Sequence, residues 1–217
     1  MKSPISPILL SALLLLFGGI VSFIKPPKKV NKEHLIQFYR TNISAYEKTE
    51  NQGDLLTKVR FIPTDFTTLK LLNEDEQAAI DFQKEAQTAL SFLVQLEAPS
   101  IGNKEFLNLK NDSLSFEERV SYFSFNFRND ISYQIDNGQI LSISDFHFER
   151  LFNISPYGNF NISIPLPNKR AKLLKIIIRD KIYDFEHTTF EFDLKKINEF
   201  PRLKIETKTK STTSKQY

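Results

Sequence analysis

The chain begins with an apolar run that contains no charged residue. Charged residues first become frequent after this run, which separates it from the rest of the chain. Residues 8–24 read ILLSALLLLFGGIVSFI and contain no charged side chain. About 20 apolar residues suffice for a helix to cross the hydrocarbon core of a bilayer. The run therefore predicts contact with the membrane through residues 8–24, as part of an anchor or signal segment with a short spacer at residues 1–30.

A retained anchor and a cleaved signal peptide both fit this run. The best cleavage candidate, Ile20-Val21-Ser22, places Ile where signal peptidases prefer a small residue. Lys25, Lys28 and Lys29 follow closely, as in a stop-transfer flank. The pattern favours a retained single-pass anchor near the amino terminus, and a cleaved, secreted form is the alternative.

Competing signals bear on the side of the membrane where the rest of the chain lies. Lysines dominate the flank after the apolar run, and positively charged flanks usually stay in the cytoplasm. Long soluble domains, however, translocate largely regardless of their charge. A lone amino-terminal apolar segment ahead of such a domain is typical of export. We therefore expect an extracytoplasmic, periplasmic body.

Helical spacing of apolar residues continues into the next section, residues 31–110. Asn31 can cap a helix that extends to about Lys48. Residues 55–72 are apolar without a clear period, and they receive no assignment. The section as a whole is predicted to be helical.

The strongest helical pattern covers residues 74–97. Asn73 is placed as its cap, with Glu76 three residues later. Apolar residues recur at spacings of three and four, at Ala79, Phe82, Ala86, Ala89, Leu93 and Leu96. The pattern predicts one long helix that packs against the core.

After Phe116 the period of the apolar positions falls from about 3.6 residues to about 2. Asn137-Gly138 is the dipeptide that favours a tight hairpin, with positive φ at both central positions. The alternating segments lie near residues 123–127, 131–135, 141–148, 160–166, 174–178 and 190–194. About six or seven short strands separated by turns predict an antiparallel, β-sandwich-like domain over residues 111–203.

The expected fold class is therefore α+β. It comprises an N-terminal transmembrane or signal helix, a helical section at residues 31–110 and an antiparallel β-sandwich-like domain at residues 111–203. Residues 204–217 are rich in Lys and Thr, and we expect a disordered basic tail there.

Charge is unevenly distributed along the chain. The net charge is +3, but residues 1–32 carry +5 and residues 204–217 carry +3, which leaves −5 for residues 33–203. Nucleic-acid-binding proteins usually concentrate Lys and Arg on a folded face. The acidic body therefore argues against a nucleic-acid partner.

The composition excludes several kinds of site. The chain has no Cys, so disulfides, thiol nucleophiles and cysteine-bound metals are excluded. No phosphate-binding loop, dinucleotide-binding motif, H-E-x-x-H motif or nucleophile elbow is present. The sequence assigns no catalytic or cofactor-binding residue, and it favours a protein that is not an enzyme.

One local pattern leaves a metal site open as an alternative. On a strand, Asp145, His147 and Glu149 would share one face while Phe146 and Phe148 face the other. Together with His187 further along the chain, His147 and Glu149 could form a two-histidine, one-carboxylate site for iron or zinc. Solvent-facing polar residues above a phenylalanine core are the competing interpretation.

The segment His147-Phe148-Glu149-Arg150, followed by Ser155-Pro156-Tyr157 and Phe160, resembles uncharacterised membrane-tethered envelope proteins of Bacteroidota-type bacteria. The Lys-, Asn-, Ile- and Phe-rich composition is similar too. The resemblance covers the β-rich half and implies an exported, membrane-tethered protein, with no activity attached.

These observations favour a non-catalytic, membrane-tethered cell-envelope protein whose β-rich domain mediates protein–protein interaction or scaffolding. One alternative is a metal-dependent enzyme that uses His147, Glu149 and His187. The other is a lipid or small-ligand carrier whose sheet encloses a phenylalanine-lined cavity. No cofactor is expected on the favoured interpretation.

Overall fold

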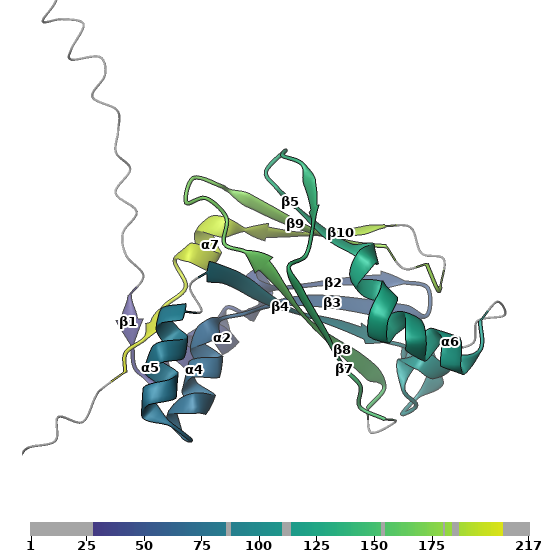
Figure 1. Ribbon diagram of the computed structural model, residues 1–217, viewed down its shortest axis with the longest axis horizontal. Helices are drawn as coiled ribbons and strands as arrows, with labels where there is room; N and C mark the ends of the chain where they lie inside the picture. Colours follow the sequence, from purple (N-terminus) through teal and green to yellow (C-terminus); the bar gives the residue numbers. More distant parts are fainter. Residues whose placement is uncertain are drawn as a thin grey trace, which may run out of the picture.

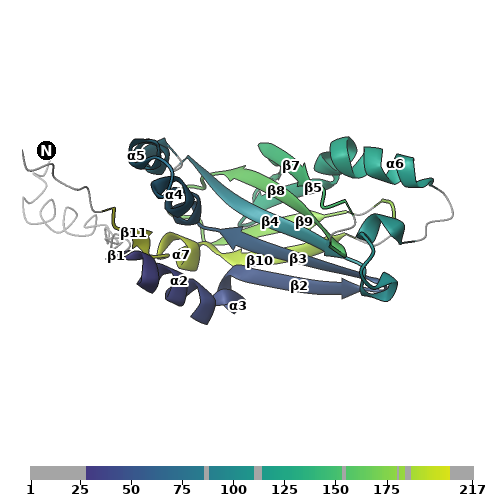
Figure 2. The same cartoon turned by 90° about the horizontal axis from the view of Figure 1, so that it is seen from below.

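The computed structural model describes residues 28–85, 88–109, 114–152, 155–179, 181–183 and 187–205. Helices and antiparallel sheets are combined in these residues, which confirms the predicted α+β class. In both views, two sheets form the middle of the molecule, with α2, α4 and α5 at one end and α6 at the other (Figures 1 and 2). The predicted membrane segment at residues 8–24 lies outside the described residues.

Five antiparallel strands form the larger sheet, in the order β2-β3-β4-β8-β7. The strands are β2 (Glu47–Gln52), β3 (Leu55–Ile62), β4 (Ala89–Glu97), β7 (Asp145–Glu149) and β8 (Tyr157–Pro165). Alternate residues of β3, β4 and β8 are buried, because successive side chains of a strand point to opposite faces. Strands from the predicted helical section and from the predicted β-rich section thus share one sheet.

Four antiparallel strands form the second sheet, in the order β10-β9-β5-β6. The strands are β5 (Ile131–Ile135), β6 (Ile140–Ser142), β9 (Leu173–Ile178) and β10 (Thr188–Asp193). Tyr133, Ile176 and Phe190 are buried on one face of this sheet. The amide of Gln52, the last residue of β2, donates a hydrogen bond to the hydroxyl of Thr188, which opens β10. One edge of each sheet therefore meets the other sheet.

Phenylalanine rings fill the space between the two sheets. The ring of Phe92 on β4 lies 5.0 Å from the ring of Phe192 on β10, so the contact joins the two layers directly. Phe160 on β8 has its ring 4.6 Å from that of Phe148 and 4.9 Å from that of Phe127. A single cluster of buried residues includes side chains of both sheets. The helical and β-rich sections share this core.

The prediction of one helix over residues 74–97 is wrong in its second half. The helix α5 (Glu76–Glu85) covers the first part, and β4 covers residues 89–97. Leu90, Phe92, Val94 and Leu96 are all buried, so this segment follows a period of two. The apolar residues of the segment fit both periods. The tertiary structure selects the strand, because β4 pairs with β3 on one side and with β8 on the other.

The cap of this helix also differs from the prediction. Asn73 ends the preceding helix α4 (Thr64–Leu72), and the carboxylate of Asp75 accepts a hydrogen bond from the backbone N–H of Ala78 instead. The unassigned residues 55–72 form β3 and α4. The sequence shows no clear period here, because one face of β3 is buried and the other face is half-buried.

The prediction of a strand at residues 123–127 is also wrong. The segment belongs to a helical run of α6 (Phe116–Ser121), the π-helical turn η4 (Tyr122–Asn126) and the 3-10 helix η5 (Phe127–Asp130). Phe123 and Phe127 are fully buried, whereas Phe125 is 71% exposed. A strand would have placed all three rings on one face. Ser115 and Glu118 form a capping box that starts the helix, and the alternation of Phe with polar residues concealed this signal.

The predicted helix after Asn31 is confirmed at its start, but it is divided at Asn42 and ends before Lys48, which lies in β2. The side chain of Asn31 accepts a hydrogen bond from the backbone N–H of His34 and caps α2 (Lys32–Thr41), which α3 (Ile43–Tyr46) follows. The hairpin turn at residues 137–138 is also confirmed, because the backbone N–H of Gly138 donates to the carbonyl of Ile135. This bond makes Asp136 and Asn137 the central residues of the turn, and positive φ occurs at Asp136 (φ 51°) and not at Asn137 or Gly138, where it was predicted.

Both ends of the described chain meet at the helical end of the molecule. The strands β1 (Lys29–Val30) and β11 (Arg202–Leu203) pair in parallel, and the short helix α7 (Leu194–Asn198) leads into β11. Asp65, at the start of α4, is 1% exposed and holds β11 in place. Its carboxylate accepts a hydrogen bond from the backbone N–H of Leu203 at 2.7 Å and lies 3.2 Å from the guanidinium of Arg202.

Across the described ranges, from Lys28 to Ile205 with their gaps, no helix is long and apolar enough to cross a bilayer. The predicted basic tail lies outside these ranges from residue 206 onward.

We expect Asp65→Ala to lower the free energy of unfolding by about 3 kcal/mol, because the substitution leaves the buried N–H of Leu203 without its acceptor and removes the carboxylate that pairs with Arg202. Asp81→Ala is the control, since Asp81 is an exposed carboxylate on α5 that lies 3.4 Å from Lys84. Its effect should stay below about 1 kcal/mol. Urea unfolding of the detergent-solubilised chain measures both values, and equal effects would contradict the role of Asp65.

Acid should weaken the fold through Asp136. Hydrogen bonds from the backbone N–H groups of Leu173 and Lys172 lower the pKa of this carboxyl below its ordinary value of 3.8. The stabilisation is therefore complete above about pH 4 and is lost as the pH falls through the lowered pKa. Between pH 6 and pH 3, Asp136→Asn should lose less stability in urea unfolding than the unmodified chain. An identical loss in both would show that Asp136 does not contribute.

Candidate functional site

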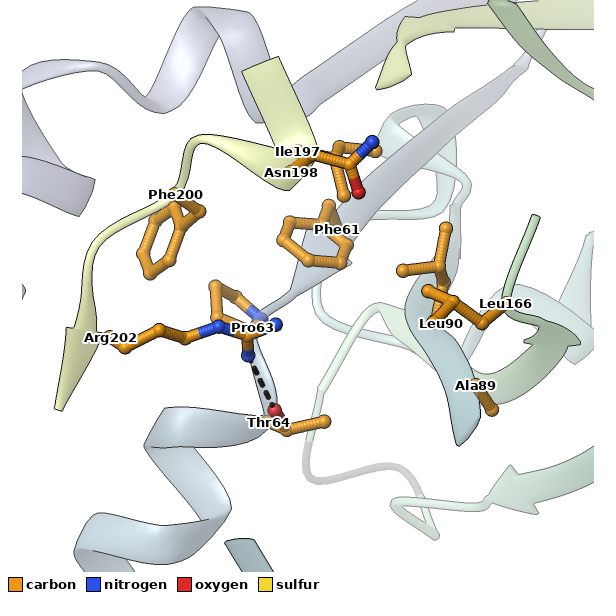
Figure 3. A pocket seen from close by; sticks show the side chains of 10 residues that line it. All are labelled: Phe61, Pro63, Thr64, Ala89, Leu90, Leu166, Ile197, Asn198, Phe200 and Arg202. Atoms are coloured by element: carbon orange, nitrogen blue, oxygen red, sulfur yellow. Dashed lines mark hydrogen bonds between the residues drawn. The ribbon is translucent and has the colours of Figure 1, made fainter. Parts of the chain in front are cut away.

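The hollow at the helical end of the molecule is too small to hold a ligand. It lies between Phe61, Pro63 and Thr64 at the end of β3 and the segment that carries Ile197 and Arg202, and its volume is about 30 Å³ (Figure 3). The guanidinium of Arg202 donates a hydrogen bond to the hydroxyl of Thr64 at 3.3 Å across its mouth. Such a space accommodates about one or two water molecules.

A larger hollow, which we call the outer groove, lies over the outer face of the four-stranded sheet. Its volume is about 470 Å³. Figure 1 shows this sheet as the layer of β5, β9 and β10 beside the five-stranded layer. Most of the side chains that line the groove are polar, namely Asn129, Asp130, Ser132, Gln134, Lys175, Arg179, His187 and Thr189. Ile140 and Ile177 complete the lining.

Strand register brings the floor of the outer groove together. Thr189, Ile177 and Ser132 lie opposite one another on β10, β9 and β5 and form one row across the sheet. Lys175 and Gln134 are paired in the next row, which Ile140 on β6 extends. The neighbouring residues in each strand face the core, so these side chains face outward.

Among the described residues that line the outer groove, Lys175 and Arg179 carry positive charge and Asp130 carries negative charge. The carboxylate of Asp130 is 8% exposed, and it is already bound by the hydroxyl of Tyr122 at 2.6 Å and by the ammonium of Lys181. Lys175 lies 3.5 Å from Glu191, at the exposed edge of the sheet.

Arg179 and His187 are both exposed, and within the described part of the chain their side chains make no hydrogen bond or ion pair. The groove therefore offers a guanidinium and an imidazole that the fold itself does not use. Hydroxyl and amide groups of Ser132, Thr189 and Asn129 line the same hollow. This arrangement can hold an acidic, hydrogen-bonding ligand.

The structure does not assemble the metal site considered from the sequence. His147 and Glu149 lie on β7 and face outward from the five-stranded sheet, whereas Phe146 and Phe148 pack against the core, as the alternation predicted. His187 lines the groove on the outer face of the other sheet. The two histidines are thus on opposite outer faces, with the core between them. Among the described residues no three His, Asp or Glu side chains form a group that could hold a metal ion.

The interior between the sheets gives no support to a lipid carrier. Phe92, Phe106, Phe123, Phe160 and Phe192 are each at most 1% exposed. Neighbouring rings in this set lie 5.0 to 6.1 Å apart, which is contact distance for aromatic side chains. Phenylalanine side chains therefore occupy the space that a bound acyl chain would need.

A buried ion pair at the α6 end has a structural role. Glu105 is fully buried, and the guanidinium of Arg150 binds its carboxylate at 3.0 and 3.1 Å. The same guanidinium lies over the rings of Phe116 and Phe152. The pair joins the segment after β4 to the segment after β7, and each charge is used within the fold.

Sequence inspection missed every residue of the outer groove except His187. Ser132, Gln134 and Lys175 interrupt apolar strands at alternate positions, and that alternation was the available signal. The pairing of β5 with both β9 and β6 was needed to bring them onto one surface.

Comparisons of this chain with protein-family models, with curated proteins and with solved structures found no match. The geometry of the described residues is therefore the basis for the functional argument below.

Exposed groove residues should be dispensable for folding. We expect Arg179→Ala and His187→Ala to change the free energy of unfolding by less than about 0.5 kcal/mol, because neither side chain has a partner in the described fold. Asp130→Ala should lower the free energy of unfolding by about 2 kcal/mol, because the hydroxyl of Tyr122 and the ammonium of Lys181 lose the buried carboxylate that binds them. Urea unfolding compares the three variants, and a large loss from Arg179→Ala or His187→Ala would identify a structural role instead.

Proposed function

We propose that this chain is a non-catalytic, membrane-tethered cell-envelope protein whose sandwich-like body binds a protein partner. The observation that supports this most directly is the outer groove, in which Lys175, Arg179 and His187 line one hollow of about 470 Å³. Arg179 and His187 contribute nothing visible to the described fold. Exposed, unused charge in a hollow is typical of a binding surface.

Binding explains the groove better than catalysis does. Nucleophilic catalysis needs a hydroxyl in hydrogen-bond reach of a base that a third group orients. The hydroxyls of Ser132 and Thr189 make no hydrogen bond to the imidazole of His187 among the described residues. Asp130, the carboxylate among the described residues that line the groove, is bound by Tyr122 and Lys181 instead.

The partner that fits the outer groove is an acidic protein segment. Lysine and arginine pair with carboxylates, and the hydroxyl and amide groups on the floor can satisfy backbone groups. Ile140 and Ile177 add apolar contact at the groove, and Ile140 is 57% exposed. The groove crosses several strands, so an extended segment can contact the two rows of floor residues together.

The apolar segment at residues 8–24 is the proposed membrane tether, and it ends close to Lys28. Lys28 and β1 lie at the helical end of the molecule, and the outer groove lies over a sheet in its middle (Figure 1). The resemblance of residues 147–160 to envelope proteins of Bacteroidota-type bacteria is in accord with an extracytoplasmic body. A tether at that end leaves the groove open to a partner in the envelope.

Reversing charge in the groove should reduce partner recovery. The variant Lys175→Glu/Arg179→Glu, purified in detergent from cells that produce the full chain, should retain about one tenth of the partner that the unmodified chain retains. The matched control is Lys58→Glu/Lys104→Glu, which reverses two charges outside the groove and should retain the partner.

Mass spectrometry of the co-purified proteins, after chemical cross-linking, measures the recovery. Urea unfolding checks that both variants fold. Equal recovery from the groove variant and the control would reject the groove as the binding surface. A chain that purifies without any cross-linked partner would reject the binding function.

A further inference from the structure

Two segments far apart in sequence form one edge of the molecule. The backbone N–H of Arg202 donates to the carbonyl of Lys28 at 2.9 Å, and the N–H of Lys204 donates to the carbonyl of Val30 at 2.8 Å. These bonds pair β1 with β11 in parallel. β1 lies at the helical end in both views, and Figure 2 shows the pair next to α2. Lys204 is thereby placed next to the lysines that follow the apolar segment.

Lysines gather on this edge, which we call the basic end and define as Lys28, Lys29, Lys32 and Lys204. All four are exposed. Arg202 does not add to them, because the buried carboxylate of Asp65 neutralises it. The acidic turn between α4 and α5 follows the last residue of α4, whereas the basic end lies near the first. Because α4 has nine residues and is about 13 Å long, the turn is separated from the basic end by about that length.

Glu33 follows Lys32 directly in α2, and Glu85 is two residues after Gln83, whose amide donates a hydrogen bond to the carbonyl of Leu203. The sequence adds Lys25 before β1, and Lys208, Lys210 and Lys215 against Glu206 after β11. The folded body between these segments has the opposite net charge. The pairing of β1 with β11 therefore brings described lysines from two distant segments of the sequence to one edge.

The length of the connecting chain limits how far the basic end can lie from a membrane. Residue 24 ends the apolar run, and Lys28 is four residues further on. Four residues span at most about 14 Å when fully extended. The headgroup layer on each side of a bilayer is about 5–7 Å thick, and the Debye length is about 8 Å at physiological salt. Charges on the basic end thus remain within electrostatic reach of the headgroups.

We propose that the basic end docks onto anionic phospholipid headgroups of the membrane that residues 8–24 enter. The proposal rests on the membrane tether proposed above. Each lysine near an anionic surface adds to the attraction, and the flexible lysine side chain suits headgroups that have no fixed geometry. Docking holds the helical end against the bilayer at two segments of the chain and so limits rotation of the body about its tether.

Lysine footprinting of the full chain in lipid nanodiscs tests this docking. The chain is inserted into nanodiscs of phosphatidylcholine alone or of phosphatidylcholine with phosphatidylglycerol. An amine-acylating reagent then modifies accessible lysines, and mass spectrometry gives the rate at each position. Acylation of Lys28, Lys29, Lys32 and Lys204 should be about fivefold slower in the anionic nanodiscs. Lys58 and Lys104, away from the basic end, should react equally in both and serve as internal controls.

Salt and charge reversal identify the cause of any protection. Salt on the order of 0.5 M should abolish the difference between the two lipids. The variant Lys32→Glu/Lys204→Glu should lose the protection of Lys28 and Lys29, and Lys104→Glu should retain it. Urea unfolding confirms that both variants fold.

The outcomes separate this proposal from the tether on which it rests. If the chain does not enter nanodiscs, the tether and the docking are both overturned. If the chain enters and the four lysines react equally in both lipids, docking is overturned and the tether stands. Protection that salt does not remove would also overturn docking, because it would indicate steric shielding.

Discussion

Packing of phenylalanine rings between two antiparallel sheets is the constraint on which the rest of this structure depends. Phe92 and Phe192 meet across the sheets with ring centroids 5.0 Å apart, and Phe160 contacts Phe127 at 4.9 Å. Burial of apolar surface supplies most of the free energy that favours folding. Since the rings occupy the interior, polar side chains of the same strands have to face outward. The outer groove is therefore a consequence of how the core is filled.

A second constraint is the closure of the chain at the helical end. Asp65 holds β11 through the N–H of Leu203 and the guanidinium of Arg202, and β11 in turn pairs with β1. The carboxylate is buried, so its loss would leave the N–H of Leu203 unsatisfied in the interior and would remove the anion beside the part-exposed guanidinium of Arg202. This contact places the chain segment next to the proposed tether and the segment next to the carboxyl-terminal tail on one edge. The proposed partner and the proposed lipid contact thus use different parts of one rigidly packed body.

The pairing of strands and the packing of helices explain why the sequence-based predictions were wrong for two segments. Residues 89–97 contain apolar residues at both helical and alternating positions, and the two neighbouring strands of the sheet decide in favour of β4. At residues 123–127 the opposite occurs, since a capping box at Ser115 and Glu118 starts a helical run that buries Phe123 and Phe127 and exposes Phe125. In both segments the apolar spacing permits two structures, so propensity alone cannot choose between them. The two histidines of the metal hypothesis lie apart for a related reason, because His147 is on β7 of one sheet and His187 directly precedes β10 of the other.

The sequence by itself determined the α+β class, the helix that Asn31 caps, the hairpin at residues 137–138 and the strands from residue 131 onward, because each depends on a local period or turn residue. It also determined the separation of positive ends from an acidic body, which is a matter of composition. Only the tertiary structure decided that β4 is a strand, that Lys175, Arg179 and His187 line one hollow, and that Lys204 is hydrogen-bonded to Val30, two residues from Lys28. Each of these depends on hydrogen bonds between segments distant in sequence, and their partners cannot be read from the spacing of residues along one segment.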